Sequence, residues 1–277
     1  MLTGKTTLIA HLGFPTEAFK APMIYNPWFE RQRIDALVVP MGIRAPDYAQ
    51  ALQTLSRMTN LRGALVTMPH KVSTLALVQD VSTGARIAGA SNALLRREDG
   101  SWYADQFDGI GFTRGLRRKG RAVQGQSVLV VGCGGVGSAI AAAIAAEGPA
   151  RLDLFDSTAA AAEALRKRLL AFYPRLDVRC GSNDPAGHGI VVNATPLGMK
   201  EGDPLPLEAQ RIAPGSFVGE VVMKSEYTPL LRAALERGCE VQLGVDMLFE
   251  MIPAYLEFFG FGTASPDDLR AVARILY

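Results

Sequence analysis

The sequence predicts an α/β protein, and two observations support this prediction. Short runs rich in β-branched and other apolar residues, such as 36–41 and 63–67, alternate with segments of helical periodicity along most of the chain. The uncharged run 128–131 is then followed by a glycine-rich turn and an alanine-rich helix, which is typical of a doubly wound parallel sheet. The length of 277 residues is sufficient for two domains.

The turn after the strand 128–131 follows the spacing G-x-G-x-x-G. The first glycine permits the tight turn, the second lets a pyrophosphate approach the backbone, and the third lets the helix pack closely on the strand. The N-terminal amides of that helix would face the phosphates. We therefore expect a dinucleotide-binding site that includes Gly132, Gly134, Gly135, Val136 and Gly137.

Asp156 predicts the choice of dinucleotide. It ends the next strand, 152–155, about 20 residues after the last glycine, where a carboxylate accepts hydrogen bonds from the adenosine ribose. That carboxylate would repel the 2′-phosphate of NADP, and the first arginine after it is Arg166. We expect NAD to be preferred, with NADP possible. The alternative is that Asp156 only caps the helix that starts near Ala159.

Composition excludes several other classes of protein. The chain is 48% hydrophobic and 20% charged with a net charge of +2, and its dense basic run, 114–121, suits a solvated helix end, so nucleic-acid binding is not expected. The uncharged stretch 128–146 has the length of a membrane span, but its glycines and β-branched start favour strand, turn and helix. We expect no membrane segment and no secretory signal, and hence a cytoplasmic protein. We also expect a monomer or a homodimer.

The cysteines and histidines do not predict a metal site. The three cysteines are odd in number and far apart, and the three histidines lack metal-ligand spacing. We therefore expect neither a disulfide framework nor a bound metal.

The first part of the chain alternates strands and helices but has no phosphate loop. We expect strands at 6–12, 36–41 and 63–67, a helix at 72–79, and a hairpin formed by 93–96 and 101–104. This segment predicts a separate α/β domain that presents a substrate. The predicted domains are therefore 1–108, for substrate binding and catalysis, and 109–246, a Rossmann domain for NAD(P).

Two charged residues are candidates for the chemistry. A dehydrogenase that acts on an alcohol needs a group that takes or gives the hydroxyl proton while hydride moves to or from the nicotinamide. Lys71 lies just after a strand end, where ligands of open α/β sheets gather, and Asp108 lies at another junction, before Gly109. Together they could share the proton and orient the hydroxyl. For either residue alone, a surface salt bridge is the alternative.

Five segments of the sequence resemble motifs of the shikimate dehydrogenase family, in the family's order and spacing across nearly the whole chain. The resemblance is to VTxPHK, GAxNTL, NTDGxGF, NATPxGM and TPLL, and it is borne here by Val66–Lys71, Gly89–Leu94, Gln106–Phe112, Asn193–Met199 and Thr228–Leu231. It implies that Lys71 and Asp108 are the catalytic pair. It also implies that the C-terminal helices, 247–277, return to the N-terminal domain.

The resemblance further implies roles for four other residues. Thr67 and Asn92 would contact the substrate, while Thr195 and Met247 would line the cofactor or nicotinamide pocket.

The departures from the family pattern concern the end of the pocket that binds an acid. The family's SxSP segment, whose serines hold the substrate carboxylate, is replaced by Phe19-Lys20-Ala21-Pro22. Other polar positions of the family are also changed, and the residues found there are Leu65, Gln106, Phe107, Met223 and Met251.

These changes predict an apolar acid end. Burying a carboxylate without donors costs several kcal/mol, so such a pocket, lined by Phe19, Ala21 and Met251, would reject shikimate. Lys20 could bind the carboxylate if its side chain turns inward, and a solvated Lys20 is the alternative.

The sequence thus predicts an NAD-preferring oxidoreductase, similar to shikimate dehydrogenases, that interconverts a secondary alcohol and a ketone on a small cyclic substrate. One alternative is an authentic shikimate or quinate dehydrogenase. Another is a non-catalytic, NAD-binding regulatory protein, against which the presence of both Lys71 and Asp108 argues.

Overall fold

The computed structural model describes residues 2–17 and 19–275, and the chain divides into two compact units. Unit 1 is made of Met1–Arg86, Ala90–Phe107 and Ile252–Tyr277, and unit 2 of Ile87–Gly89 and Asp108–Met251. Residues 87–89, Asp108 and residues 247–251, which the boundaries predicted from the sequence assign to the substrate domain, belong here to unit 2.

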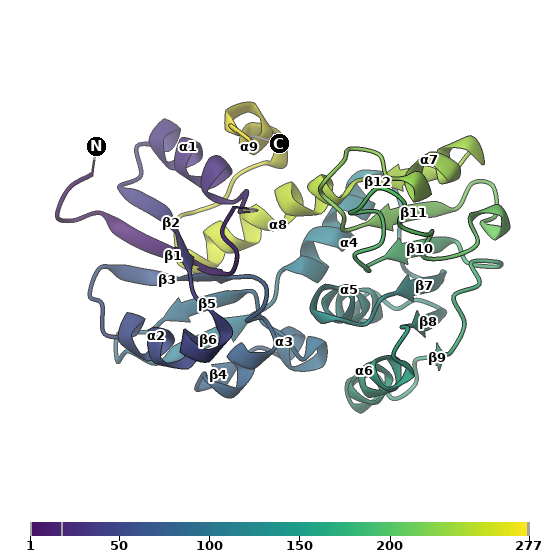
Figure 1. Cartoon of the computed structure of the whole chain (residues 1–277), viewed down its shortest axis with the longest axis horizontal. Coiled ribbons are helices and arrows are strands. Elements are labelled where there is room, and N and C mark those ends of the chain that lie inside the picture. Colours follow the sequence, from purple (N-terminus) through teal and green to yellow (C-terminus); the bar gives the residue numbers. More distant parts are fainter. Residues whose placement is uncertain (1, 18, 276–277) are drawn as a thin grey trace. The chain divides into compact units, whose positions relative to one another are not determined.

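Unit 1 contains a mixed six-stranded sheet among its described residues (Figure 1). The order is β2-β1-β3-β5-β6-β4; β1 pairs in parallel with β2 and β3, β6 pairs in parallel with β4, and β5 is antiparallel to both of its neighbours. The strands are β1 (Thr7–Gly13), β2 (Ala36–Gly42), β3 (Leu61–Val66), β4 (Asp80–Val81), β5 (Ala93–Arg96) and β6 (Trp102–Asp105).

The two faces of this sheet bury different side chains because residues alternate along a strand. Ala10 and Leu12 of β1 pack in one cluster with Tyr48 and Leu52 of α2 (Tyr48–Leu55). The opposite face is covered by α1 (Pro22–Gln32) and the second half of α8 (Gly244–Phe259): a Cβ at Gly63 of β3 would lie 2.6 Å from the Phe259 ring.

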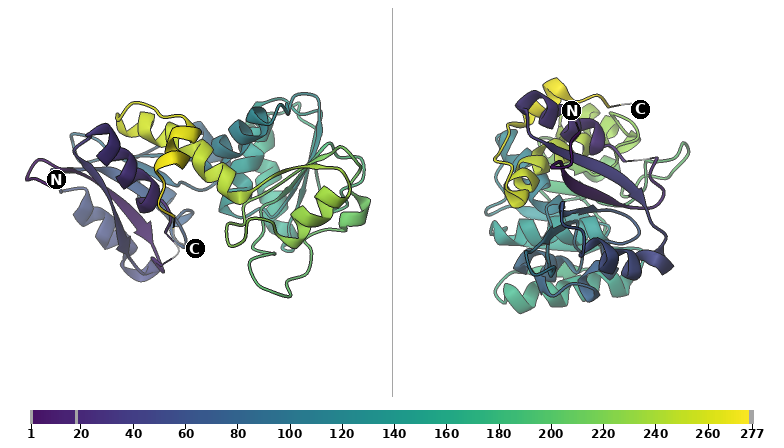
Figure 2. Two further views of the ribbon diagram at one scale, coloured as in Figure 1. Left: turned by 90° about the horizontal axis from the view of Figure 1, so that it is seen from above. Right: turned by 90° about the vertical axis from the view of Figure 1, so that its left-hand side faces the viewer.

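Aromatic rings hold the helices of this second face together. Tyr25 of α1 contacts Phe29 and Tyr255, and Phe29 contacts Phe261, with ring centroids 5.1–6.4 Å apart. The last helix, α9 (Pro266–Val272), lies beside α1 (Figure 2), and the amide of Arg274 donates to the carbonyl of Met23. The C-terminal part of the described chain therefore packs on the N-terminal part within unit 1.

The helix predicted at 72–79 is wrong. Only a 3₁₀ turn, η2 (Ser73–Ala76), forms there, followed by β4 and α3 (Thr83–Ala88). The hydroxyls of Ser73 and Thr74 both donate to the carbonyl of His70, and such local side-chain bonds compete with the backbone ladder of a helix. A second 3₁₀ turn, η1 (Ala45–Asp47), precedes α2.

Unit 2 is a parallel six-stranded sheet in its described part, in the order β12-β11-β10-β7-β8-β9. Counted within the unit, this is the doubly wound order 3-2-1-4-5-6 of a Rossmann fold, which confirms the predicted fold class. The strands are β7 (Ser127–Val131), β8 (Arg151–Phe155), β9 (Val178–Cys180), β10 (Ile190–Asn193), β11 (Phe217–Glu220) and β12 (Glu240–Gln242).

Both faces of the central strand β7 are buried, which explains why its sequence is continuously apolar. Val128 and Val130 belong to one core cluster, and Leu129 and Val131 belong to another. The helical elements of this unit are α4 (Asp108–Arg118), α5 (Gly135–Ala146), α6 (Ala159–Phe172), η3 (Ala209–Arg211), α7 (Pro229–Glu236) and the first half of α8. Within the described chain, no helix combines the length and apolar character that a membrane crossing requires.

The glycine-rich turn supplies a stability prediction with an internal control. A Cβ at Gly137 would collide with the carbonyl oxygen of Gly132, whereas a Cβ at Gly134, where φ is −71°, would meet no atom within 4 Å. We expect Gly137→Ala to lower the free energy of unfolding by about 1–3 kcal/mol through overpacking, and Gly134→Ala to leave it nearly unchanged. Urea unfolding of both variants tests this, and equal stability of the two would contradict it.

Candidate functional site

The loop between β7 and α5 leaves space where a pyrophosphate would lie. Gly132 has a φ of +100°, and a Cβ there would come within 2.8 Å of the Ala194 carbonyl group. Gly134 caps α5, and the position of its missing Cβ is open. The protein itself does not need glycine at this position, but a ligand that approaches the N-terminal amides of a helix does. The loop therefore fits a dinucleotide.

The loop also positions the carboxylate of Asp156. Its two oxygens accept the backbone amides of Cys133, at 2.7 Å, and of Thr158, at 2.8 Å. A carboxylate has further lone pairs, so these bonds orient Asp156 without exhausting its capacity to bind ribose hydroxyls. Arg166 is engaged elsewhere, with Glu163 and with the carbonyl of Val178.

The segment after β10 forms a second rigid edge of this site. The Asn193 amide oxygen accepts the backbone amide of Thr195 at 3.0 Å and its hydroxyl at 2.7 Å, while the Asn193 amide nitrogen donates to the carbonyl of Leu197. Met247 is buried at the start of α8, and a Cβ at Gly111 of α4 would lie 2.6 Å from its carbonyl oxygen. The predicted cofactor residues are thus all in unit 2.

Glu220 is a buried carboxyl at the same edge that sequence reasoning missed. It ends β11 opposite Asn193 of β10, and its Oε2 accepts the hydroxyl of Thr228 at 2.8 Å. The Thr228 hydroxyl in turn accepts the Leu231 amide and caps α7. Among the described residues Oε1 has no partner, and burial raises the pKa of Glu220 to about 7. The carboxyl thus links α7 to the edge that carries Thr195.

The pKa of Glu220 predicts a pH-dependent stability. Because the folded protein holds this proton up to about pH 7 and the unfolded chain only to about 4.5, stability falls as the pH rises through this window. Glu220→Gln, which stays neutral and still accepts from Thr228, should gain on the order of 2 kcal/mol relative to wild type at pH 8 and little at pH 5. Thermal unfolding at both pH values tests this; the same difference at pH 5 and pH 8 would contradict it.

In unit 1, Lys71 and Thr67 lie just beyond β3. The backbone of Lys71 is fixed because its carbonyl accepts the amide of Ser91 at 2.8 Å, which joins this loop to the segment before β5. Thr67 donates its amide to the carbonyl of Leu12, and its methyl group occupies the space above Gly13. The backbone of both residues is therefore held in place at the end of the parallel strands.

Asn92 is held by hydrogen bonds of its backbone and its side chain within unit 1, one of them from its amide to the carbonyl of Asp105. Its side-chain oxygen accepts the Phe107 amide at 2.9 Å, and its carbonyl accepts the amide of Val66 and the hydroxyl of Tyr255. Its side-chain nitrogen Nδ2 is buried and has no hydrogen-bond partner among the described residues. A buried donor without a partner is unfavourable, so this atom is a candidate ligand-binding group.

Phe19 does not lie alone at the acid end of unit 1. Its ring stacks on His11 of β1, with centroids 4.0 Å apart, and lies above Gly13. His11 is the register partner of Leu65, is 7% exposed, and has an Nδ1 with no partner in the described chain. Burial, and secondly the charge of Lys71, lower the pKa of His11 to about 3. The predicted apolar surface thus includes a buried neutral imidazole.

Two other residues of the predicted acid end begin α1. Ala21 is buried at the N-cap position, before Pro22. Lys20 is partly buried, and this burial lowers its pKa. The inward orientation of Lys20 remains a prediction.

Asp108 and Met251 belong to unit 2. Asp108 is the first residue of α4 and is buried. Two glycines bring α4 close to its neighbours: a Cβ at Gly109 would collide with the carbonyl of Ala139, and a Cβ at Gly111 would lie 2.7 Å from the Cβ of Met251. The two predicted catalytic residues are therefore fixed in different units, Lys71 after β3 and Asp108 at the start of α4.

Comparison with known proteins identifies the family of this chain. Residues 12–94 match the model of the shikimate dehydrogenase substrate-binding domain. The chain is 35% identical, over 275 residues, to a shikimate dehydrogenase (NADP(+)) of Acidiphilium cryptum, with 99% of this chain and 98% of the relative covered. The chain belongs to the shikimate dehydrogenase family. The predictions of this family and of an oxidoreductase within it are confirmed.

Solved structures of this family share the fold. Shikimate 5-dehydrogenase from Listeria monocytogenes, in complex with shikimate and NAD, has a TM-score of 0.88 and 26% identity, covering 98% of this chain and 97% of the other. Quinate dehydrogenase from Corynebacterium glutamicum, in complex with NAD, has a TM-score of 0.87 and 26% identity, covering 96% and 98%.

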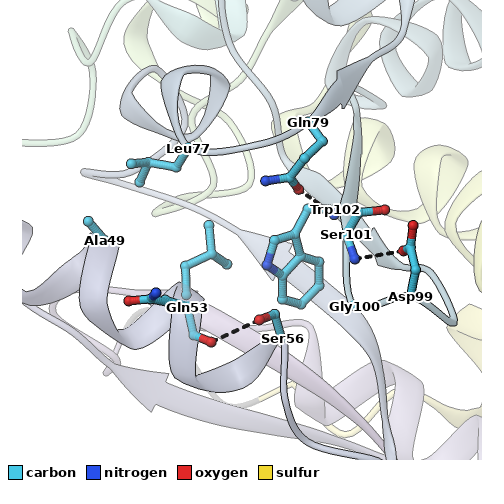
Figure 3. Close-up of a pocket in the computed structure, with 10 residues that line it drawn as sticks. Ala49, Gln53, Ser56, Leu77, Gln79, Asp99, Gly100, Ser101 and Trp102 are labelled. Carbon is cyan, nitrogen blue, oxygen red and sulfur yellow. Dashed lines mark hydrogen bonds between the residues drawn. The ribbon is translucent and has the colours of Figure 1, made fainter.

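A pocket of about 350 Å³ in unit 1 lies apart from the predicted site residues (Figure 3). It is on the α2 side of the sheet, next to Trp102, whose amide donates to the side chain of Gln79. Its lining residues are Ala49, Leu52, Gln53, Ser56, Leu77, Gln79, Asp99, Gly100, Ser101 and Trp102.

Across the described residues, no three His, Cys, Asp or Glu side chains are grouped so that they could hold a metal ion.

Proposed function

We propose that this member of the shikimate dehydrogenase family uses NAD(P) to interconvert a secondary alcohol and a ketone on a cyclic hydroxy acid of the shikimate or quinate type. The observation that supports it most is the 35% identity to a named shikimate dehydrogenase across 99% of the chain. The comparisons favour this authentic activity over the divergent substrate that the changes at Phe19, Ala21 and Leu65 predicted. Those changes keep a neutral cyclic alcohol as the second candidate.

In the proposed reaction the alcohol loses one proton and one hydride, and each needs an acceptor. The loop with Gly132 and Gly134, together with Asp156, would hold the NAD(P), which would supply the hydride acceptor for the oxidation of the alcohol. Lys71 would take the hydroxyl proton, and Asp108 would hold the hydroxyl and tune the lysine. Thr67 and Asn92 would donate to other oxygens of the ring, since the Nδ2 of Asn92 has no partner in the described chain.

The kcat/KM values for different alcohols test the proposed class of substrate. We expect oxidation of shikimate or quinate with a kcat/KM in the ordinary enzyme range, about 10⁴ M⁻¹s⁻¹ or above. Turnover of neutral cyclic alcohols such as cis-1,2-cyclohexanediol, with no turnover of either acid, would contradict it and support the second candidate.

Removal of Lys71 tests the proposed mechanism. We expect Lys71→Ala to lower kcat by roughly 10²-fold or more because a general acid–base group is lost, with the affinity for NAD changed only a few-fold. Steady-state kinetics and a fluorescence titration with NADH measure the two quantities. Turnover close to that of the wild type would exclude Lys71 from proton transfer.

The cofactor preference is a separate proposal. Relatives are named for NADP(+), whereas the Listeria and Corynebacterium structures hold NAD. Since Asp156 is fixed beside the glycine loop and Arg166 is bonded elsewhere, we expect a higher kcat/KM with NAD than with NADP. Asp156→Ala should lower the ratio of kcat/KM with NAD to kcat/KM with NADP, because it removes the carboxylate that repels the 2′-phosphate of NADP. Equal or better use of NADP by the wild type would contradict this preference.

A further inference from the structure

We infer that His11, assisted by Tyr25, binds the carboxylate of the substrate in place of the missing serine pair and so determines specificity for an acid. The inference rests on the proposed function and names the residues that make an acid acceptable to this pocket. The sequence alone suggested Lys20 for this role.

The pairing of β1 with β3 places His11 next to a position that has lost a polar group. His11 and Leu65 are register partners on parallel strands, so their side chains leave the same face of the sheet, about 5 Å apart. Leu65 stands where the family resemblance places a substrate-binding asparagine. Phe19, which stands in place of the first serine, stacks on the imidazole with the ring centroids 4.0 Å apart. His11 therefore neighbours two positions that bind substrate in the family pattern.

Tyr25 has the same relation to the second missing serine. Its amide donates to the carbonyl of Ala21, so it lies one helical turn later on the same face of α1. Helical side chains lean toward the N-terminus, which directs the phenol back toward Ala21. The hydroxyl is buried, it has no partner among the described residues, and burial raises its pKa well above the ordinary value, so it is a donor at neutral pH.

The buried polar atoms of unit 1 that lack partners in the described chain thus include His11 Nδ1, Tyr25 Oη and Asn92 Nδ2. Each can donate a hydrogen bond, and each belongs to a residue that is at most 7% exposed. Leaving them unpaired costs free energy that an oxygen-rich ligand would recover. A set of donors with no unpartnered carboxylate among them suits an anion better than a cation.

The charges around His11 also favour an anion. On the α1 side of β1, the titratable groups of the packed elements that are not exposed are Lys71 after β3, Lys20 before α1, Tyr25 of α1 and Tyr255 in the second half of α8, whereas Glu30, Arg31, Arg62 and Glu257 on the same elements are exposed. Of these, Lys71 disfavours a proton on His11 in the free protein. A substrate carboxylate placed against the imidazole would oppose this effect and raise the pKa of His11. Binding of an acid should then be coupled to uptake of a proton by His11.

The test is the pH dependence of KM for shikimate, or for quinate if that is the better substrate, from pH 6 to 9. In the wild type we expect KM to rise with pH, by up to tenfold per pH unit between the pKa of His11 in the free protein and the higher pKa that it has in the complex, and to level off above the latter. His11→Gln keeps a donor but cannot titrate, so its KM should be higher at pH 6 and should lose this pH dependence, with kcat within a few-fold. His188→Gln, which alters a buried histidine of unit 2, should keep the wild-type profile.

A second pair of variants covers the case in which His11→Gln does not fold. Tyr25→Phe should raise KM for the acid roughly tenfold through loss of one hydrogen bond to a charged group, and should leave KM for NAD unchanged. Tyr48→Phe is its control, since Tyr48 is also buried in unit 1 but bonds to Thr74 on the α2 side of the sheet.

The outcomes separate the inference from the proposed function. An unchanged KM and pH profile in His11→Gln, together with an unchanged KM in Tyr25→Phe, would overturn the inference while shikimate or quinate activity still supported the function. Absence of turnover of both acids by the wild type would contradict the substrate class, and with it the acid-binding role of His11.

Discussion

The pairing of β1 with β3 is the constraint on which the substrate side of the molecule depends. It sets His11 beside Leu65, and the bond from the Thr67 amide to the Leu12 carbonyl extends the same register to the loop that carries Lys71. A slip of one residue would turn each of these side chains to the opposite face of the sheet. The core on the α2 side stabilises this register, because Ala10 and Leu12 of β1 pack there with Tyr48 and Leu52, and a slip would put His11 in their place.

Unit 2 meets its ligand through backbone rather than through specialised side chains. The loop after β7 leaves helix amides free, Asp156 fixes that loop by accepting the Cys133 amide, and Asn193 fixes the loop after β10. These backbone groups would contact NAD and NADP in the same way. Of the residues named here, only Asp156 distinguishes NAD from NADP. Substrate specificity must therefore come from side chains outside these loops, such as Phe19, Ala21 and Leu65, where this chain departs from the family motifs.

Sequence patterns predicted the Rossmann unit well because its glycines, its apolar strands and Asp156 are local signals. They failed where the decisive contact is not local. Ser73 and Thr74 end helix formation by bonding to His70, and the three-residue strand β12 begins with a glutamate and exists through its pairing with β11. His11 looked like one polar residue in an apolar strand, since its neighbours Phe19 and Leu65 are distant in sequence. The comparison of motif positions identified the polar groups that were lost, but not the histidine and tyrosine that lie beside them.

The most direct test of the account is the number of protons taken up when shikimate binds the protein in the presence of NADH, which cannot react with an alcohol. Calorimetric titrations at pH 7 in two buffers of different ionisation enthalpy give this number. If His11 binds the carboxylate, a substantial fraction of one proton should be taken up by the wild type and none by His11→Gln. Tight binding of shikimate with no proton uptake would contradict it.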